Sequence, residues 1–549
     1  MQRLLLLMAS ALLILAWLSP DHYTPWLTFS SELLTFASAM CLLALYLDKS
    51  LLIPKMQWFW GVVCLIPLVQ WCFGLEFYFG KALLASLYLF AFGMITLLGV
   101  NLAKDFERGR ILNYFSLVIF FAGLATAIIA LLQWLQLEKH VMGLMPLRGN
   151  RPYANFAQPN NMATFLLMSL MGAFYLFEKR LLKTWALAGG AFILLFTIAL
   201  SQSRTPWIAC FILTGYLLLK HRYDDYRLRK LTVVMWALVY IFCLLVVPYL
   251  NQFLYHFGLA HTEMSNIVAR ANSSHSRLGI WTQMLYAINE QPWWGYGWNQ
   301  TSVAQLDAAK FYIHPERTNS AHNLVLELLV WNGVILGGAI ITYLSYWIYR
   351  LNQVVKSKET VIATLMVVGV LLHMMLEFPQ NYAYFLLPVG FLLGFIQSYI
   401  QNQRYGTLKS GVTTVILVSS ILLYGLIWRD YIVSVNTLFD AKEKSDQGLV
   451  DKTKILVLDQ FSERAQWYAL NRFSHLDVQQ MQRFEHVVQT TPSHYDLFKY
   501  AQLQAYNGNE TLAKEQLFQI KALYNLNHFY ENLLKKRDKD GNLIDEAVK

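Results

Sequence analysis

The sequence predicts an all-α polytopic membrane protein, and three observations support that prediction. Of its 549 residues, 56% are hydrophobic and only 14% are charged. Apolar runs of about 20 residues, long enough to cross a hydrocarbon core of about 30 Å as a helix, recur from the first residue to about residue 428. Basic residues gather in every second loop between these runs. A soluble domain of this length shows neither this composition nor this pattern.

About 13 of the apolar runs are predicted to be transmembrane helices. No small-x-small cleavage site follows the first run, so we interpret it as a signal anchor rather than a removed signal peptide. The predicted spans are residues 3–19, 25–47, 57–74, 80–100, 113–136, 160–177, 184–202, 205–220, 231–250, 328–349, 360–377, 382–399 and 411–428.

The net charge of +10 lies in short loops rather than in one basic domain, and it nearly cancels beyond residue 428. Lys and Arg are retained on the cytoplasmic side of a membrane, so the alternation places the N-terminus inside and, after an odd number of spans, the C-terminus outside. The charge therefore reflects topology in a lipid bilayer, and we expect no nucleic-acid partner. The basic loops lie near residues 49–55, 104–110, 179–183, 220–230, 350–358 and 404–409.

The predicted domains are a transmembrane bundle over residues 1–428, which includes a large outer loop at 251–327, and a C-terminal helical domain over 429–549. In the second domain, helical periodicity at 495–501 and 513–523 flanks a Gly-Asn turn. Such a helix pair resembles one tetratricopeptide hairpin, which favours a domain that recognises a protein partner.

The large outer loop contains a helical pattern at 276–288, followed by a segment rich in tryptophan and glycine at 292–298. Tryptophans at this position are typical of an amphipathic element at the level of the lipid headgroups. A direct part in ligand binding is the alternative, and the sequence leaves both open.

Several arginines fall on the predicted outer side, where the topology rule disfavours them, and four of them are candidates for a binding site: Arg151, Arg204, Arg270 and Arg277. A single arginine at a span end can extend its charge to the interface, but several on one face indicate an anion site. One guanidinium group can donate two parallel hydrogen bonds to the oxygens of a phosphate. The cluster therefore predicts a diphosphate group rather than a neutral ligand.

His322 lies where the large outer loop re-enters an apolar helix. Alone, such a histidine is most often a structural residue, but an imidazole on the side of the arginines can accept a hydroxyl proton near neutral pH. Glu377 and Tyr382 lie in a short polar turn between two late spans. They either orient His322 or satisfy backbone groups at the Pro379 turn.

Metal chemistry is not predicted, because the outer loops contain no carboxylate pair with metal-ligand spacing, and we expect no cofactor. The five cysteines all lie in apolar spans, which indicates neither a disulfide framework nor a zinc site.

Several of these segments together resemble the O-oligosaccharyltransferases of the PglL type, within the wider group of O-antigen ligases and Wzy polymerases. The resemblance runs from about residue 150 to 395 and onward into the C-terminal domain. The motifs that carry it are Gln158-Pro159-Asn160, Ser201-Gln202-Ser203-Arg204, Arg277 with Trp281 and Gly295, Ala321-His322-Asn323, and Glu377-Phe378-Pro379 with Tyr382. At Asn161 many relatives have histidine, so no catalytic role is assigned there.

The resemblance implies transfer of a preassembled glycan from an undecaprenyl-diphosphate carrier to a Ser or Thr hydroxyl of a pilin-like or other periplasmic protein. The enzyme would lie in a bacterial inner membrane with its active site and C-terminal domain in the periplasm, and would use no metal. His322 matches the essential histidine, Gln158 and Tyr382 match residues that support activity, and Arg204 and Arg277 match the diphosphate-binding arginines. Arg151 and Arg270 are expected beside them, with Asn160, Asn323 and Glu377 in support.

Three alternatives remain at this point. An O-antigen ligase would transfer the glycan to lipid A core, and a C-terminal domain suited to a protein acceptor argues against it. A lipid-linked glycan flippase or transporter would place polar residues near the midplane, whereas here they lie at the outer ends of spans. A purely structural assembly protein leaves the histidine and the arginines unexplained.

Overall fold

The computed structural model describes residues 1–260, 275–445, 454–537 and 543–547. The chain forms two compact units, each built from three stretches of sequence. Unit 1 comprises Met1–Val63, Tyr88–Ser273 and Leu344–Leu422, and unit 2 comprises Cys64–Leu87, Ser274–Tyr343 and Leu423–Lys549. Unit 2 thus combines the C-terminal region with most of the predicted outer loop.

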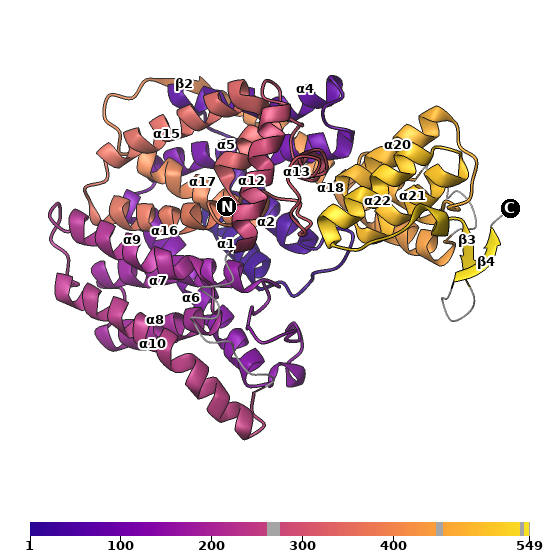
Figure 1. Cartoon of the computed structure of the whole chain (residues 1–549). Coiled ribbons are helices and arrows are strands. Elements are labelled where there is room, and N and C mark those ends of the chain that lie inside the picture. The colour runs from indigo at the N-terminus through magenta and orange to yellow at the C-terminus, as the bar shows by residue number, and fades with distance from the viewer. Residues whose placement is uncertain (261–274, 446–453, 538–542, 548–549) are drawn as a thin grey trace. The chain divides into compact units, whose positions relative to one another are not determined.

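The described chain is almost entirely helical, as predicted (Figure 1). Among the described residues, seven helical segments are long and apolar enough to cross a membrane, and four shorter apolar helices accompany them. The seven are Phe29–Tyr46, Phe79–Asp105, Arg108–Trp134, Pro159–Glu178, Lys230–His256, Leu324–Gln353 and Ser410–Glu443, and the four are Gln2–Leu18, Thr184–Leu200, Thr205–Lys220 and Ala383–Gln397. The chain is therefore an all-α multi-pass membrane protein, and the count of thirteen spans stays a prediction.

Unit 1 is a helical bundle with a single small sheet. Its elements are α1 (Gln2–Leu18), α2 (Phe29–Leu43), β1 (Leu51–Pro54), α3 (Trp58–Val63), most of α5 (Phe79–Asp105), α6 (Arg108–Trp134), α7 (Pro159–Glu178), α8 (Thr184–Leu200), α9 (Thr205–Lys220), α10 (Lys230–His256), part of α15 (Gly338–Gln353), α16 (Lys358–Met374), α17 (Ala383–Gln397), β2 (Tyr405–Leu408) and the start of α18 (Ser410–Glu443).

Helix α7 lies at the centre of this bundle. It packs against α6, α8 and α16, and its side chains are buried along nearly its whole length. A helix that is buried all round needs apolar residues on every face, which explains why its sequence shows no amphipathic stripe. Because α7 begins directly at the Gln158-Pro159-Asn160 motif, the rigid centre of unit 1 holds that motif in place.

The predicted basic loops carry structure of their own that the sequence pattern did not predict. Strands β1 and β2 pair antiparallel, with Leu51 opposite Leu408, although they come from loops far apart in the chain. Lys104 lies over the ring of Tyr405 at 3.8 Å from its centroid, which adds a cation–π contact next to the sheet.

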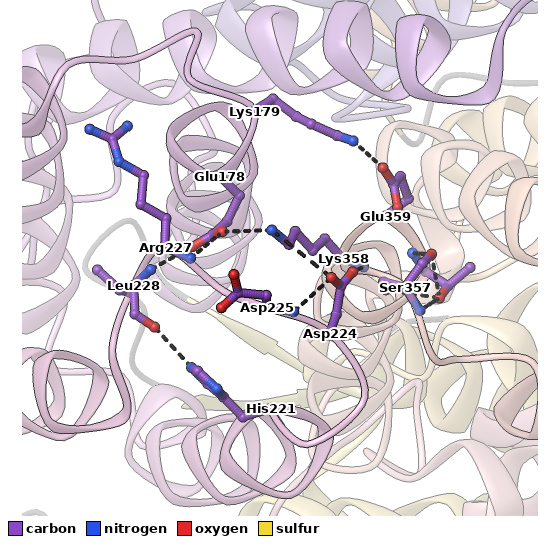
Figure 2. Close-up of polar contacts among 11 residues, drawn as sticks. Glu178, Lys179, His221, Asp224, Asp225, Arg227, Leu228, Ser357, Lys358 and Glu359 are labelled. Carbon is purple, nitrogen blue, oxygen red and sulfur yellow. Dashed lines mark hydrogen bonds and ion pairs between the residues drawn. The ribbon is translucent and has the colours of Figure 1, made fainter.

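Charged side chains also connect the ends of α7 and α16 to the loop between α9 and α10 (Figure 2). The buried carboxylate of Glu178 accepts two backbone N–H groups of that loop at 2.8 Å each. Lys358 lies 3.7 Å from Glu178 and 4.0 Å from Asp224, and Lys179 pairs with Glu359. These predicted cytoplasmic charges therefore form a specific network that fixes three helix ends.

Unit 2 combines helices from three parts of the sequence. Its elements are α4 (Ile66–Cys72), the first turns of α5, α12 (His275–Glu290), α13 (Thr301–Ala308), α14 (Leu324–Asn332), a π-helical turn (Gly333–Gly337), the start of α15, most of α18, α19 (Asp459–Ala469), α20 (Val478–Thr490), α21 (His494–Tyr506), α22 (Glu510–Tyr524) and an antiparallel pair of short strands, β3 (Lys535–Arg537) and β4 (Leu543–Ala547).

Two predicted spans are interrupted. The run 57–74 folds as α3 and α4, because Pro67 lacks a backbone N–H group and suits the first turn of a new helix rather than the interior of a long one. The run 328–349 passes through the π-helical turn between α14 and α15, where Gly333 adopts φ +65°. The apolar pattern predicted the helices, but not these breaks.

The break at Gly333 packs against the Trp293-Trp294-Gly295 segment of the outer loop. The backbone N–H groups of Tyr296 and Gly297 donate to the last carbonyls of α14, at 2.9 and 3.0 Å. Trp293 and Trp294 are exposed, whereas Tyr296 and Trp298 are buried. The exposed pair is compatible with the headgroup-level element considered above, while the buried pair anchors the segment.

Replacing Gly333 by alanine is expected to destabilise unit 2 by roughly 1–3 kcal/mol, because φ +65° strains an L-residue and the added Cβ would lie 2.3 Å from the carbonyl oxygen of Trp293. Gly338→Ala is the matched control, since a Cβ there meets nothing within 4 Å. Thermal unfolding of the two purified variants measures the difference. Equal melting temperatures would contradict the expectation.

The C-terminal helices form two helical hairpins. The predicted pair is α21 and α22, with the turn at Gly508-Asn509, and α19 and α20 precede it (Figure 1). Asp496 in the first turn of α21 accepts from Arg464 at 2.7 Å and from the indole of Trp467 at 2.8 Å, which fixes α21 against α19. Their core includes Tyr78 and Leu306, so α13 of the outer loop packs into the same apolar cluster.

Candidate active site

His322 lies in a strained loop of unit 2 immediately before α14. Its φ of +51° falls in the left-handed region, which non-glycine residues rarely adopt. The side chain is half-buried, and the backbone N–H donates to the Ser320 hydroxyl at 3.1 Å. A backbone held in this conformation requires support from its surroundings, and such residues concentrate at functional sites.

The support comes from the buried carboxylate of Glu327, in the first turn of α14. One oxygen accepts from the Ser320 hydroxyl at 2.5 Å and from the Ala321 backbone N–H at 2.7 Å. The other oxygen accepts from the Thr301 hydroxyl at 2.7 Å. Glu327 therefore fixes the two residues before His322 and ties them to α13.

A second set of hydrogen bonds fixes the segment that precedes this loop. Gln305 of α13 accepts from the Thr318 backbone N–H at 2.8 Å and donates to the Glu316 carbonyl at 2.7 Å. It also donates to Gln283 of α12 at 2.9 Å. Helices α12 and α13 thus position the segment that leads to His322, and Arg277, half-buried in the first turn of α12, belongs to the same unit.

Asn323 follows His322 and is the N-cap of α14. Its side-chain oxygen accepts from the backbone N–H groups of Val325 at 3.0 Å and Leu326 at 3.2 Å. An N-cap of this kind defines where the helix begins, and so where the strained loop ends. Asn323 therefore stabilises the start of α14, and its supporting role in activity stays a prediction.

Three predicted motifs meet in unit 1 through a chain of hydrogen bonds. Glu377, buried before the Pro379 turn, accepts from the Asn160 amide at 3.0 Å. The Asn160 oxygen in turn accepts from the Arg151 guanidinium at 3.0 Å. Arg151 also donates through Nε to the Ser201 carbonyl at 2.7 Å. The loop between α6 and α7, the start of α7, the α8–α9 turn and the polar turn before α17 are therefore linked.

Replacing Asn160 by alanine is expected to destabilise unit 1 by about 1–3 kcal/mol, because it leaves Glu377 and Arg151 without one partner each. Lys139→Ala, at an exposed position between α6 and α7, is the control variant. The melting temperature of each purified variant measures the effect. An Asn160→Ala protein as stable as the control would show that the chain of bonds does not hold the motifs together.

Gln158 and Tyr382 are both N-cap residues, of α7 and α17. Neither side chain makes a capping hydrogen bond. The ring of Tyr382 stacks on Tyr384, with centroids 5.2 Å apart and planes at 17°, and the Tyr384 hydroxyl accepts from Asn161 at 3.4 Å. Gln158 and Tyr382 thus stand at the ends of two helices whose flanking residues are joined by the Asn160–Glu377 bond.

Arg204 is half-buried at the start of α9, directly after the turn in which Gln202 has φ +48°. Since Arg151 binds the carbonyl of Ser201 in this turn, two of the predicted arginines belong to one local structure. Arg270 lies outside the described residues.

The residues that sequence reasoning missed are the supports of the His322 loop: Glu327, Ser320, Thr301 and Gln305. A signal was available for Glu327, because a carboxylate within an apolar run is costly and is normally retained for a purpose. The hydroxyl and amide groups gave no such signal, since their role depends on contacts distant in sequence.

Comparison with known proteins agrees with these features. Residues 189–342 match a family described as O-Antigen ligase. Residues 360–538 match a family described as the C-terminal part of a virulence factor membrane-bound polymerase. Residues 152–177 match a family described as protein glycosylation ligase. The chain is 42% identical over 538 residues to a general O-oligosaccharyltransferase of Acinetobacter baylyi, covering 97% of this chain and 94% of the relative. It is 28% identical to a ComP-specific O-oligosaccharyltransferase of the same organism, covering 89% of each.

The matched regions contain the His322 loop, the α8–α9 turn and the Gln158 motif, and the first relative is similar over nearly its full length. The chain belongs to the O-oligosaccharyltransferase family.

Proposed function

We propose that this chain moves a preassembled glycan in one step from an undecaprenyl-diphosphate carrier to a Ser or Thr hydroxyl of a protein. The observation that carries the proposal is the 42% identity to a general O-oligosaccharyltransferase over nearly the whole chain. The strained His322 loop, fixed by a buried carboxylate, supports it, because a proton acceptor for a hydroxyl must be held in a defined position.

The proposed reaction assigns one role to the histidine and another to the arginines. The His322 imidazole accepts the proton of the acceptor hydroxyl while the hydroxyl oxygen bonds to the anomeric carbon of the first sugar. The bond from that carbon to the diphosphate oxygen breaks, and the oxygen keeps the electron pair. Arg204 and Arg277, with Arg151 and Arg270, stabilise the negative charge that develops on the departing diphosphate.

Arg151 and its neighbours also have a positioning role in this proposal. Arg151 fixes the turn that precedes Arg204 and holds Asn160, which in turn binds Glu377. Gln158 and Tyr382 flank this chain of bonds and are proposed to contact the donor or the acceptor. Of the alternatives considered for Glu377, its bond to Asn160 favours a role in organising unit 1.

We propose the topology that the basic loops predict: thirteen spans in a bacterial inner membrane, a cytoplasmic N-terminus, and the large outer loop and residues 429–549 in the periplasm. Protease added to intact spheroplasts should then remove the C-terminal domain. Cleavage of this domain only after lysis would place it in the cytoplasm and refute the topology.

We propose a general acceptor range that includes pilin-like and other periplasmic proteins, because identity is higher to the general relative than to the ComP-specific one. The test is co-expression with a lipid-linked glycan pathway and several acceptors, a pilin among them, followed by mass spectrometry of the modified residues. Whole-glycan modification of several acceptors is expected. Modification of a single acceptor would refute the general range.

Transfer to lipid A core is the second candidate, because residues 189–342 match the O-Antigen ligase family. The same co-expression strain distinguishes transfer to lipid A core from transfer to protein. Lipid A core that carries the glycan, with every protein acceptor unmodified, would favour the ligase reaction and contradict protein glycosylation.

A further inference from the structure

A polar cavity in unit 2 lies apart from the His322 loop, between α13 and the C-terminal helices α20, α21 and α22. Its open space is about 250 Å³, whereas a single water molecule needs only about 10–15 Å³. Each helix contributes side chains spaced three or four residues apart, which is the spacing of one helical face. The cavity is thus large enough for a compact organic group, and four helices define its walls.

Two glutamines of α22 make this cavity unlike an ordinary gap between helices. Gln516 and Gln519 both line it, and each is only 7% exposed. Among the residues that the structure describes, neither side chain makes a hydrogen bond. Neither amide is among the fully enclosed polar groups that lack a partner, so both face the open space of the cavity, where a ligand can supply donors and acceptors to them.

The charged groups of the cavity already have partners within the protein. Lys310, two residues after the end of α13, lies 3.4 Å from both Asp307 and Glu515. The Glu485 carboxylate accepts from the Gln489 amide at 3.0 Å, and burial together with Glu515 raises the pKa of Glu485. The lining contains three carboxylates and one lysine, so an anionic ligand is disfavoured.

The neutral groups that remain suit a sugar ring. Each hydroxyl of a sugar both donates and accepts, and a glutamine amide offers two N–H donors and one acceptor oxygen on a planar group. The rings of Tyr296 and Tyr500 also line the cavity and supply apolar area, while their hydroxyls donate to Asp307 at 2.8 Å and to the Met481 carbonyl at 3.3 Å. An open space of about 250 Å³ favours a compact ring over an extended peptide.

We propose that the cavity bounded by α13, α20, α21 and α22 binds one neutral sugar unit, with Gln516 and Gln519 as its recognition residues. The inference rests on the proposed function only for the source of that sugar, which is the glycan that the enzyme transfers. A sugar-binding site in this cavity would hold a part of the glycan that does not react. The enzyme would then favour glycans that carry a neutral sugar in that part.

The test is direct binding of free sugars to the full-length protein in phospholipid nanodiscs, since detergents with sugar headgroups would compete. Saturation-transfer NMR with galactose, glucose and N-acetylgalactosamine should show contact for at least one of them, and none for glucuronic acid. The Gln516→Leu/Gln519→Leu protein should bind at least tenfold more weakly. Gln479→Leu, on α20 but outside the cavity lining, should bind as the wild type does.

Hydrogen exchange in the wild-type protein gives a second measurement that needs no variant. Addition of the binding sugar should slow exchange along Glu510–Tyr524. Absence of sugar binding, unchanged binding by the double variant, or protection of α22 by an acceptor peptide instead of a sugar would each overturn the inference.

Different results would refute the cavity site and the proposed glycan transfer. His322→Ala should bind the sugar as the wild type does, because the histidine is not part of the cavity lining. Glycan transfer without sugar binding would refute the cavity site alone. Sugar binding by a wild-type protein that transfers no glycan would refute the proposed function and leave the cavity site intact.

Discussion

Replacing His322 by alanine is expected to lower glycan transfer at least about a hundredfold while the protein still inserts into the membrane, because the acceptor hydroxyl loses the group that accepts its proton. The variant removes a half-buried side chain and leaves the Glu327 hydrogen bonds to Ser320 and Ala321 in place. The fraction of acceptor that shifts in mobility, at equal enzyme abundance, measures transfer.

Two further variants separate the imidazole from the shape of its loop. Asparagine tolerates the left-handed backbone at φ +51° better than most residues but is no base, so His322→Asn should be as inactive as His322→Ala. His140→Ala, an exposed histidine of an earlier loop, should transfer normally. An active His322→Asn protein would show that only the loop conformation matters.

Replacing Glu327 is expected to have the second-largest effect, because a single carboxylate fixes the Ser320 hydroxyl, the Ala321 N–H and the Thr301 hydroxyl. Glu327→Ala leaves these buried donors without an acceptor, at about 1–3 kcal/mol each, so the variant should unfold at lower temperature and transfer no glycan. Glu327→Gln keeps the size and one acceptor oxygen. It should stay folded and lose roughly a hundredfold in kcat through misplacement of His322.

A positioning role predicts a specific kinetic result for Glu327→Gln. The value of kcat should fall while KM for the lipid-linked donor stays unchanged, since the diphosphate-binding arginines are intact. Glu290→Gln, an exposed residue at the end of α12, is the matched control and should behave as wild type. A Glu327→Ala protein as stable and active as wild type would remove Glu327 from the account.

Much of the fold could be predicted because it depends on local pattern. Apolar runs predicted α5, α6 and α7, and the Gly508-Asn509 turn predicted the α21–α22 hairpin. The pairing of β1 with β2 could not be predicted, because its register depends on two loops distant in sequence. The break at Gly333 was also missed, since a glycine in an apolar run indicates a break only when its close contact with Trp293 is known.

In the candidate site, too, local sequence features could be predicted and contacts between distant residues could not. The reading of polar residues at span ends selected Arg151, Arg204 and His322, and the resemblance added Gln158. Sequence reasoning predicted that Arg151 binds an anion, which stays a prediction, but it did not predict the bonds of Arg151 to Ser201 and Asn160. Long-range contacts of this kind, and those of Glu327, arise only from packing.

The central claim is that the whole glycan passes to a protein in one step. Purified enzyme in liposomes, with an undecaprenyl-diphosphate-linked oligosaccharide and a purified acceptor, tests it most directly by intact-protein mass spectrometry over time. We expect one product, heavier than the acceptor by the mass of the complete oligosaccharide, and no product with His322→Asn. A ladder of products that differ by single sugars, or equal transfer by His322→Asn, would contradict it.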